Sequence, residues 1–203
     1  MEYTLDWQPI LLRDPVMAGI MNGRPVIESS ARTDIYLSLL SSIISQQLST
    51  KVASVIKSRF LNLFPEQYPH PEILLTLPDE TLRSAGLSYQ KLNYIRNVAS
   101  FKGTGQLEHA FINGLEDEDL ITHLTQIKGV GRWTVEMILM FALDRPDVFP
   151  VLDLGIQNAM KKAYGLDAAG KILFTQMRQI AENWRPYRSI ACKYLWKSLE
   201  VSQ

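Results

Sequence analysis

The sequence predicts an all-α protein in which two helical lobes flank a cleft. Apolar residues recur at helical three-to-four spacing, as in the run Leu92, Ile95, Val98 and Ala99, and no segment shows the alternation expected of a strand. With 203 residues, 46% of them hydrophobic, the chain can bury one sizeable core or two smaller lobes. We interpret residues 1–203 as a single compact unit.

The N-terminal third of the chain is predicted to contain a lead-in, one long helix and several short pieces. The lead-in covers about residues 1–30, where the apolar periodicity is weak and three prolines occur. A helix is predicted next, because apolar side chains recur at its spacing: Val52, Val55, Ile56, Phe60 and Leu63. Four prolines between residues 65 and 78 confine the chain that follows to short pieces.

Capping residues mark the helices in the centre of the chain. Ser88 predicts the start of a helix at Tyr89, and Gly103 and Gly105 predict its end. The acidic run at residues 116–119 suits the first turn of a helix leading to Leu124, since negative charge is favoured at a helix N-terminus. Typical helix lengths then give about eight to ten helices.

Composition excludes several classes of protein. Cys192 is the only cysteine, so the chain has neither an internal disulfide framework nor a four-cysteine zinc or iron–sulfur site, and it suits a reducing compartment. The N-terminus lacks a basic segment followed by an apolar run, and nowhere do about 18 apolar residues follow one another. Secretion and membrane spanning are therefore disfavoured.

The net charge of zero conceals an asymmetry along the chain. Residues 1–119 carry 10 Lys and Arg against 14 Asp and Glu, whereas residues 120–203 carry 11 against 7, so the halves differ as −4 and +4. A basic half permits nucleic-acid binding, although a solvated surface often shows an excess of this size.

Two helices are predicted to meet at a Gly-x-Gly turn formed by Gly129, Val130 and Gly131. The apolar spacing on each side of the turn is helical, so residues 120–144 form a helix-turn-helix corner. Glycines at 129 and 131 allow torsions closed to other residues and a close approach to a surface, and the helix that follows offers unpaired N–H groups. Such a turn can seat a phosphate, or it can be an ordinary corner between helices.

The passage around this turn resembles the helix-hairpin-helix DNA glycosylase superfamily, and within it the DNA-3-methyladenine glycosylase II branch. The resemblance rests on residues 127–134 (Ile-Lys-Gly-Val-Gly-Arg-Trp-Thr) and 147–153 (Asp-Val-Phe-Pro-Val-Leu-Asp), with further support at residues 43–49, 86–91 and 184–189. It covers about residues 35–200. The sequence departs from the family at Lys128, where proline is common, and at Leu152, where an acidic residue often precedes the catalytic one.

The resemblance implies that Asp153 is the catalytic carboxylate. By spacing alone Asp153 is a good N-cap for the helix that follows it, and both interpretations can hold together. A carboxylate at a helix start is held ionised and oriented by nearby N–H groups, so it can face the positive charge that develops on the sugar when an N-glycosidic bond breaks. We assign Asp153 two roles, stabilising that charge and directing the attacking water.

Three aromatic residues match family positions in or near the base pocket: Trp133, Trp184 and Tyr187. Electron-rich rings hold a flipped, electron-poor base well, although aromatic side chains also dominate protein cores. Family members that also cut the DNA strand carry a Schiff-base lysine just after Gly-Val-Gly-Arg, where this chain has Trp133. An indole cannot be that nucleophile, so we expect base removal that stops at an abasic site.

The remaining implied contacts concern DNA. The passage at residues 46–49 matches a loop that inserts into the duplex, with Gln47 filling the gap, Leu48 as the wedge or as a buried helix end, and Ser49 beside them. Around the hairpin the expected DNA contacts are Lys128, Gly129, Val130, Gly131, Arg132 and Thr134. Backbone carbonyls of Thr125, Ile127 and Val130 match positions that hold a monovalent cation, Na⁺ or K⁺. No other cofactor is expected.

Together these predictions describe a monofunctional glycosylase that removes alkylated purines of the 3-methyladenine and 7-methylguanine type from duplex DNA during base excision repair. We expect a monomer, without membrane contact, in the cytoplasm or nucleoid, or in the nucleus of a eukaryote. Hypoxanthine, ethenoadenine and 1-methyladenine stay open as substrates. The alternatives are a non-catalytic helix-hairpin-helix module that binds damaged DNA and, from the zero net charge, a helical protein-interaction domain.

Overall fold

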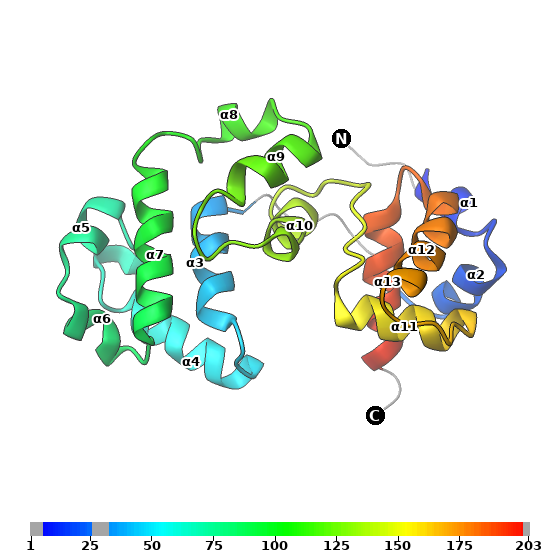
Figure 1. Cartoon of the computed structure of the whole chain (residues 1–203), viewed down its shortest axis with the longest axis horizontal. Coiled ribbons are helices and arrows are strands. Elements are labelled where there is room, and N and C mark those ends of the chain that lie inside the picture. The colour runs from blue at the N-terminus through cyan, green and yellow to red at the C-terminus, as the bar shows by residue number, and fades with distance from the viewer. Residues whose placement is uncertain (1–5, 26–32, 201–203) are drawn as a thin grey trace. The chain divides into compact units, whose positions relative to one another are not determined.

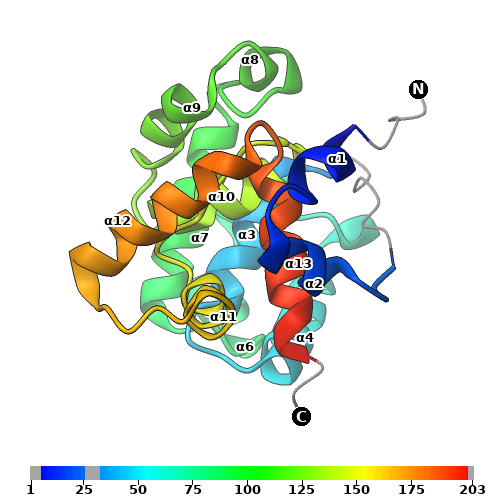
Figure 2. The same ribbon diagram turned by 90° about the vertical axis from the view of Figure 1, so that its right-hand side faces the viewer.

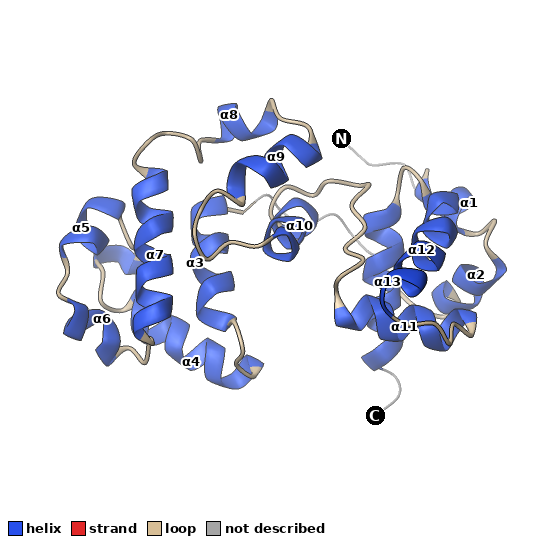
Figure 3. Ribbon diagram, viewed as in Figure 1, coloured by secondary structure: helices blue, strands red, loops and turns tan. Residues whose placement is uncertain are grey.

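The computed structural model describes residues 6–25 and 33–200, and within these ranges every regular element is a helix (Figure 3). The predicted all-α class is therefore confirmed. The α-helices are α1 (Trp7–Leu11), α2 (Pro15–Met21), α3 (Ile35–Ser45), α4 (Thr50–Leu61), α5 (Pro71–Thr76), α6 (Asp79–Ser84), α7 (Tyr89–Lys102), α8 (His109–Asn113), α9 (Asp117–Leu124), α10 (Arg132–Phe141), α11 (Leu154–Tyr164), α12 (Gly170–Ala181) and α13 (Arg188–Glu200). Two 3₁₀ helices, η1 (Pro65–Gln67) and η2 (Glu182–Trp184), complete the described part.

The number of helices exceeds the predicted eight to ten, because the described residues contain thirteen α-helices. The excess consists of pieces five to seven residues long, such as α1, α2, α5 and α8. Helices of one or two turns are too short to show apolar periodicity. Two of the short pieces, α2 and α5, begin at a proline, in agreement with the punctuation predicted from the sequence.

The chain divides into two compact units, which we call the hairpin unit (residues 32–138) and the carboxylate unit (residues 1–31 and 139–203). This division agrees with the two predicted lobes. The boundary falls within α10, whose first seven residues belong to the hairpin unit. The expectation of a cleft, and of residues 1–203 as one functional unit, stays a prediction.

The hairpin unit is built around α7, which packs against α3, α5 and α6 (Figure 1). Leu92, Ile95, Val98 and Ala99 are all buried, as their spacing predicts. Ser88 caps α7, since its Oγ accepts the Lys91 amide N–H at 3.3 Å, and α7 ends at Gly103. Both ends of this helix therefore follow the sequence prediction.

The burial of α4 differs from the prediction. Phe60 is buried, but Val52 and Val55 are each 45% exposed, and Ala53 is the second buried residue of this helix. The apolar spacing locates the helix correctly. However, some of the apolar residues that it includes lie outside the face of α4 that packs against the rest of the hairpin unit. A periodic pattern identifies a helix, whereas its neighbours decide which apolar side chains are buried.

The carboxylate unit is organised by α13, which packs against α2 and α11 and appears among its neighbours in Figure 2. The predicted lead-in forms part of this unit. Residues 1–5 and 26–30 lie outside the described residues, but α1 and α2 bury Trp7, Leu11, Met17 and Met21. Where the structure describes it, the lead-in contributes two short helices to a core, although its apolar periodicity is weak.

Asp14 fixes α2 to the rest of the carboxylate unit. Its Oδ1 accepts the amide N–H groups of Val16 (2.9 Å) and Met17 (3.2 Å), which caps α2. Its Oδ2 accepts the Tyr164 hydroxyl at 2.7 Å and the Trp184 indole N–H at 3.0 Å. Burial, followed by the hydrogen bond to Asp14, raises the pKa of Tyr164 above its usual range, so this hydroxyl stays protonated and donates.

Among the described residues no helix is both long and apolar enough to cross a bilayer.

Candidate functional site

The predicted Gly-x-Gly turn joins α9 to α10. Within it the Val130 amide donates to the Ile127 carbonyl at 2.9 Å, which closes the turn. Gly129 has φ +105°, and a Cβ at this position would lie 2.3 Å from Cγ of Tyr94, which belongs to α7. Both the torsion and the close approach therefore require glycine here. Gly131 has neither a left-handed φ nor an atom within 4 Å of an added Cβ, so the torsional argument is wrong for Gly131.

The side chains around the turn differ in exposure. Lys128, Gly131 and Arg132 are exposed, whereas Ile127, Val130 and Thr134 are buried. Of the side chains expected to contact DNA, Lys128 and Arg132 are accessible, while Val130 and Thr134 contribute mainly to the core of the hairpin unit. At Val130 and Thr134, the backbone is therefore the group that could contact a phosphate.

Arg132 also has partners within the protein. Its guanidinium donates to Glu118 of α9, with Nη1 2.9 Å from Oε2, and to the buried Glu136 of α10, with Nε 3.0 Å from Oε1. The hydrogen bond from Arg132 holds the pKa of Glu118 below its usual range. Arg132 therefore ties the two helices of the hairpin together, a role that the sequence did not indicate.

The predicted insertion loop lies between α3 and α4. Gln47 is exposed with φ +60°, which is uncommon for a residue other than glycine, and Leu48 is half-buried. Ser49 caps α4, since its Oγ accepts the Val52 amide N–H at 3.4 Å. Gln46 Nε2 donates to the Gly129 carbonyl at 3.2 Å, so this loop and the hairpin are neighbours within one unit.

Asp153 is the N-cap of α11, as its spacing predicts. Its Oδ1 accepts the Ile156 amide N–H at 2.8 Å and the indole N–H of Trp196 at 2.9 Å. Trp196 comes from α13, and an added Cβ at Gly155 would lie 2.9 Å from its Cδ1 and Nε1. The carboxylate is half-buried and is oriented by donors from two helices. Sequence reasoning found the first of these donors and missed Trp196.

The loop before Asp153 is held by the passage at residues 184–189. Asp147 accepts Nη1 of Arg185 at 2.6 Å and Nε of Arg188 at 2.7 Å. Ser189 Oγ donates to the Arg145 carbonyl at 2.7 Å and accepts the amide N–H of Val148 at 2.9 Å. Residues of the passage at 184–189 therefore position the loop that leads to Asp153. In the sequence, Asp147 is marked only as the first residue of the motif at residues 147–153.

The aromatic residues fall into two groups. Trp184 is fully buried and packs against Phe149 and Tyr164 at ring-centroid distances of 6.1 and 6.2 Å, which favours the core-packing interpretation for this residue. Tyr187 is half-buried. Trp133, in the hairpin unit, is 42% exposed at the start of α10.

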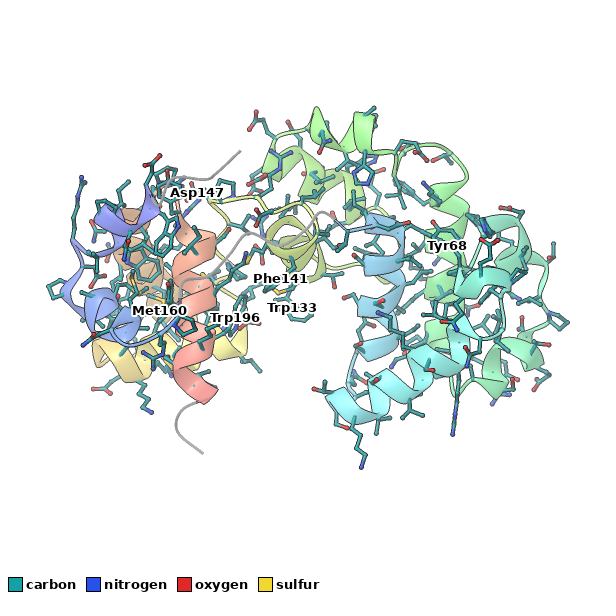
Figure 4. All side chains as sticks on the ribbon, turned by 180° about the vertical axis from the view of Figure 1, so that it is seen from behind. Tyr68, Trp133, Phe141, Asp147, Met160 and Trp196 are labelled. Carbon is teal, nitrogen blue, oxygen red and sulfur yellow. The ribbon has the colours of Figure 1, made fainter. Side chains whose placement is uncertain are left out.

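The carboxylate unit also contains a pair of aromatic residues that the sequence did not predict as part of the site. Phe141 and Trp196 lie next to one another with ring centroids 5.7 Å apart (Figure 4). Phe141 is 41% exposed, and Trp196 carries the N–H that reaches Asp153. The aromatic side chains beside the carboxylate therefore include Trp196 of α13 and its neighbour Phe141, the last residue of α10, and neither belongs to the motifs that predicted the site.

The described residues contain no group of three or more His, Cys, Asp or Glu side chains that could hold a metal ion. The expected cation site uses backbone carbonyls instead. The carbonyls of Thr125, Ile127 and Val130 all belong to the turn between α9 and α10, and carbonyl oxygens are ligands that suit Na⁺ and K⁺. The Ile127 carbonyl accepts one hydrogen bond from Val130 and has a second lone pair for a cation.

Comparison with known proteins identifies the class. Residues 40–186 match the HhH-GPD superfamily of base excision DNA repair proteins, and the chain belongs to this superfamily. Among its relatives is DNA-3-methyladenine glycosylase 1 of Schizosaccharomyces pombe, 35% identical over 178 residues, an alignment that covers 86% of this chain and 76% of the relative. A Bacillus subtilis protein, YfjP, also carries a DNA-3-methyladenine glycosylase name and is 36% identical over 172 residues, covering 82% of this chain but 59% of its own length.

Two solved structures have the same fold. The S. pombe 3-methyladenine DNA glycosylase in complex with abasic DNA superposes with a TM-score of 0.82 at 31% identity, covering 97% of this chain and 98% of that one. A DNA-3-methyladenine glycosidase from Bacillus halodurans gives a TM-score of 0.84 at 36% identity, covering 97% and 89%. The superfamily and the alkylation-repair branch expected from the motifs are thus confirmed.

Proposed function

We propose that this protein is a monofunctional DNA glycosylase that hydrolyses the N-glycosidic bond of alkylated purines in duplex DNA and leaves an abasic site. The observation that carries the proposal is the placement of Asp153, a carboxylate held at the start of α11 by the Ile156 amide and the Trp196 indole. Membership of a base excision repair superfamily and the glycosylase names of its relatives support the same reaction.

The chemistry requires an anion near C1′ of the sugar. As the C1′–N bond breaks, its electron pair leaves with the base and positive charge develops on the sugar, where Asp153 stabilises it. Water directed by Asp153 then adds to C1′ and gives its proton to the Asp153 carboxylate, which passes it to solvent. With Ile156 and Trp196 both donating to Oδ1, the carboxylate is held in one orientation throughout, so little reorganisation is needed as the charge develops.

The base side of the reaction needs binding more than acid catalysis. A purine such as 3-methyladenine is already cationic and departs readily, so the protein mainly has to hold it outside the stack. Exposed aromatic faces suit a cationic base. Trp133 and Tyr187, expected from the sequence, and Phe141 beside Trp196 supply such surfaces, whereas Trp184 is committed to the core.

Trp133 determines the class of reaction within this proposal. It occupies the position of the Schiff-base lysine in strand-cutting relatives, and an indole cannot attack C1′. The proposed product is therefore an abasic site in an uncut strand.

The hairpin and the loop at residues 46–49 supply the proposed contacts with DNA. Lys128 is exposed at the turn, and the backbone around Gly129 and Gly131 can approach a phosphate. A Na⁺ or K⁺ ion on the turn carbonyls would add positive charge there. We further propose that the protein acts as a monomer on duplex DNA.

Release of methylated bases tests this proposal. Asp153→Asn keeps a side chain that caps α11 but removes its charge, so release of 3-methyladenine and 7-methylguanine should fall at least about a hundredfold. Binding to a duplex with an abasic analogue should be largely retained.

Asp34→Asn is the matched control, because Asp34 also caps a helix and accepts an aromatic hydroxyl, from Tyr68, at 2.8 Å. Its base release should equal that of the wild type. If the wild type binds abasic DNA but releases no base, the non-catalytic damage-binding alternative is correct. Absence of any salt-dependent DNA binding would instead favour the protein-interaction alternative.

A further inference from the structure

Lys91 makes contacts that the proposed reaction does not use. It lies in the first turn of α7, with a half-buried side chain, and its Nζ donates to the backbone carbonyls of Ile44 at 2.7 Å and of Gln46 at 2.8 Å. Both carbonyls are at the C-terminal end of α3, where the last carbonyls have no partner within the helix. An ammonium group at this end also complements the helix dipole.

This arrangement fixes the loop that follows α3. Gln47, the next residue, adopts φ +60°, a conformation that costs free energy in a residue other than glycine and persists where surrounding contacts impose it. Burial lowers the pKa of Lys91, so holding the ammonium here also has a cost. The contacts of Lys91 with Ile44 and Gln46 help to hold the chain in place on the N-terminal side of Gln47.

The same helix also supports the hairpin. One turn beyond Lys91, Tyr94 packs so closely against the turn that no Cβ fits at Gly129. Asn97 Nδ2 then donates to the Lys128 carbonyl at 3.2 Å. Residues 91, 94 and 97 are spaced by three and so lie along one side of α7. Gln46, whose carbonyl Lys91 holds, completes the link by donating from Nε2 to the Gly129 carbonyl.

We propose that Lys91 is a positioning residue that holds the loop at residues 46–49 in register with the hairpin, both being fixed to one side of α7. The inference rests on the proposed function in one respect, that this loop enters the duplex where a base has left the stack. Lys91 then contributes to discrimination between damaged and undamaged DNA, because the loop engages fully only where the stack is open. General affinity for phosphates depends on other groups.

The test compares two affinities in Lys91→Met, a variant with a side chain of similar length but no charge. Affinity is measured for a duplex containing a tetrahydrofuran abasic analogue and for the same duplex undamaged. The ratio of the affinity for the abasic duplex to that for the undamaged duplex should fall by about tenfold or more, as expected from the loss of charge-assisted hydrogen bonds. The affinity for the undamaged duplex should change little.

Lys57→Met is the control, because Lys57 is an exposed lysine of α4 in the same unit and its removal changes the net charge equally. Its ratio should stay at the wild-type value. Circular dichroism and thermal unfolding report whether each variant is folded. A purely structural role for Lys91 predicts a lower melting temperature with an unchanged ratio, and that result would overturn the proposal.

Gln46→Leu provides a second variant that leaves Lys91 in place. It removes the hydrogen bond to the Gly129 carbonyl and should lower the same ratio by about twofold to tenfold. An unchanged ratio in this variant also contradicts the proposal, even if Lys91→Met does not fold. Because the ratio is a binding measurement, it is independent of base release, so failure of the glycosylase proposal and failure of this one are distinguished.

Discussion

Substituting Gly155 by alanine should misalign Asp153, because the new Cβ would press on the carboxylate and on one of its two donors, the Trp196 indole. The new Cβ would lie 2.9 Å from Cδ1 and Nε1 of Trp196 and 3.0 Å from Oδ1 of Asp153. Comfortable carbon contacts are about 3.5–4.0 Å, so one of these groups must move by roughly 0.5–1 Å. Because Gly155 lies in the first turn of α11, its backbone is fixed, and the groups expected to move are the indole and the Asp153 carboxylate that accepts its N–H.

The expected effect of Gly155→Ala has two parts, a change in stability set by two opposing contributions and a change in the rate of base release. Overpacking costs about 1–3 kcal/mol, and alanine in a helix gains about 1 kcal/mol over glycine. The net loss of about 0–2 kcal/mol corresponds to a fall in melting temperature of about 0–8 °C for a chain of this size. A displacement approaching 1 Å at a reacting group can lower a rate by about a hundredfold. The loss of rate should therefore greatly exceed what the loss of stability explains.

The assay is single-turnover release of 7-methylguanine from methylated duplex DNA, with thermal unfolding measured in parallel. Gly19→Ala is the control, because Gly19 lies within α2 and an added Cβ there would meet nothing within 4 Å. It should raise stability by up to about 1 kcal/mol and leave the rate unchanged. Normal release by a folded Gly155→Ala variant would refute the idea that close packing of Trp196 orients the carboxylate.

Two further outcomes are expected. Sodium borohydride added during incubation with abasic DNA should give no covalent adduct, because Trp133 replaces the Schiff-base lysine; a trapped complex would mean that another amine performs strand cleavage. Asp14→Ala should destabilise the protein by about 3 kcal/mol, since it removes the cap of α2 and leaves the donors of Tyr164 and Trp184 without their carboxylate. A melting temperature lowered by less than about 3 °C would show that this network contributes little.

The helices that the sequence located correctly are those with local signals. Ser88 and Gly103 bound α7 because capping depends on a hydrogen bond or a torsion within a few residues. The same holds for Asp153, whose capping bond to Ile156 spans three residues. The acidic run at residues 116–119 likewise includes the first turn of α9.

The errors arise where a residue's environment comes from distant parts of the chain. Val52 and Val55 have the spacing of core residues, but the packing around α4 leaves them exposed. Trp184 belongs to a family motif, yet its indole points to Asp14, 170 residues away along the chain. Gly131 resembles Gly129 in sequence, but only Gly129 approaches another helix. None of these differences is encoded within a local window.

The turn at residues 127–131 and the N-cap role of Asp153 were predictable from the sequence alone, because glycine-containing turns and helix caps are short-range properties. The resemblance places a Schiff-base lysine at the position of Trp133, and this difference was equally readable because it depends only on the sequence. Tertiary structure decided which groups hold these features: Trp196 reaches Asp153 from α13, Arg188 and Asp147 hold the preceding loop, and Lys91 braces the chain before Gln47. Each of these contacts joins residues more than 40 positions apart, which only the packing of helices brings within hydrogen-bonding distance.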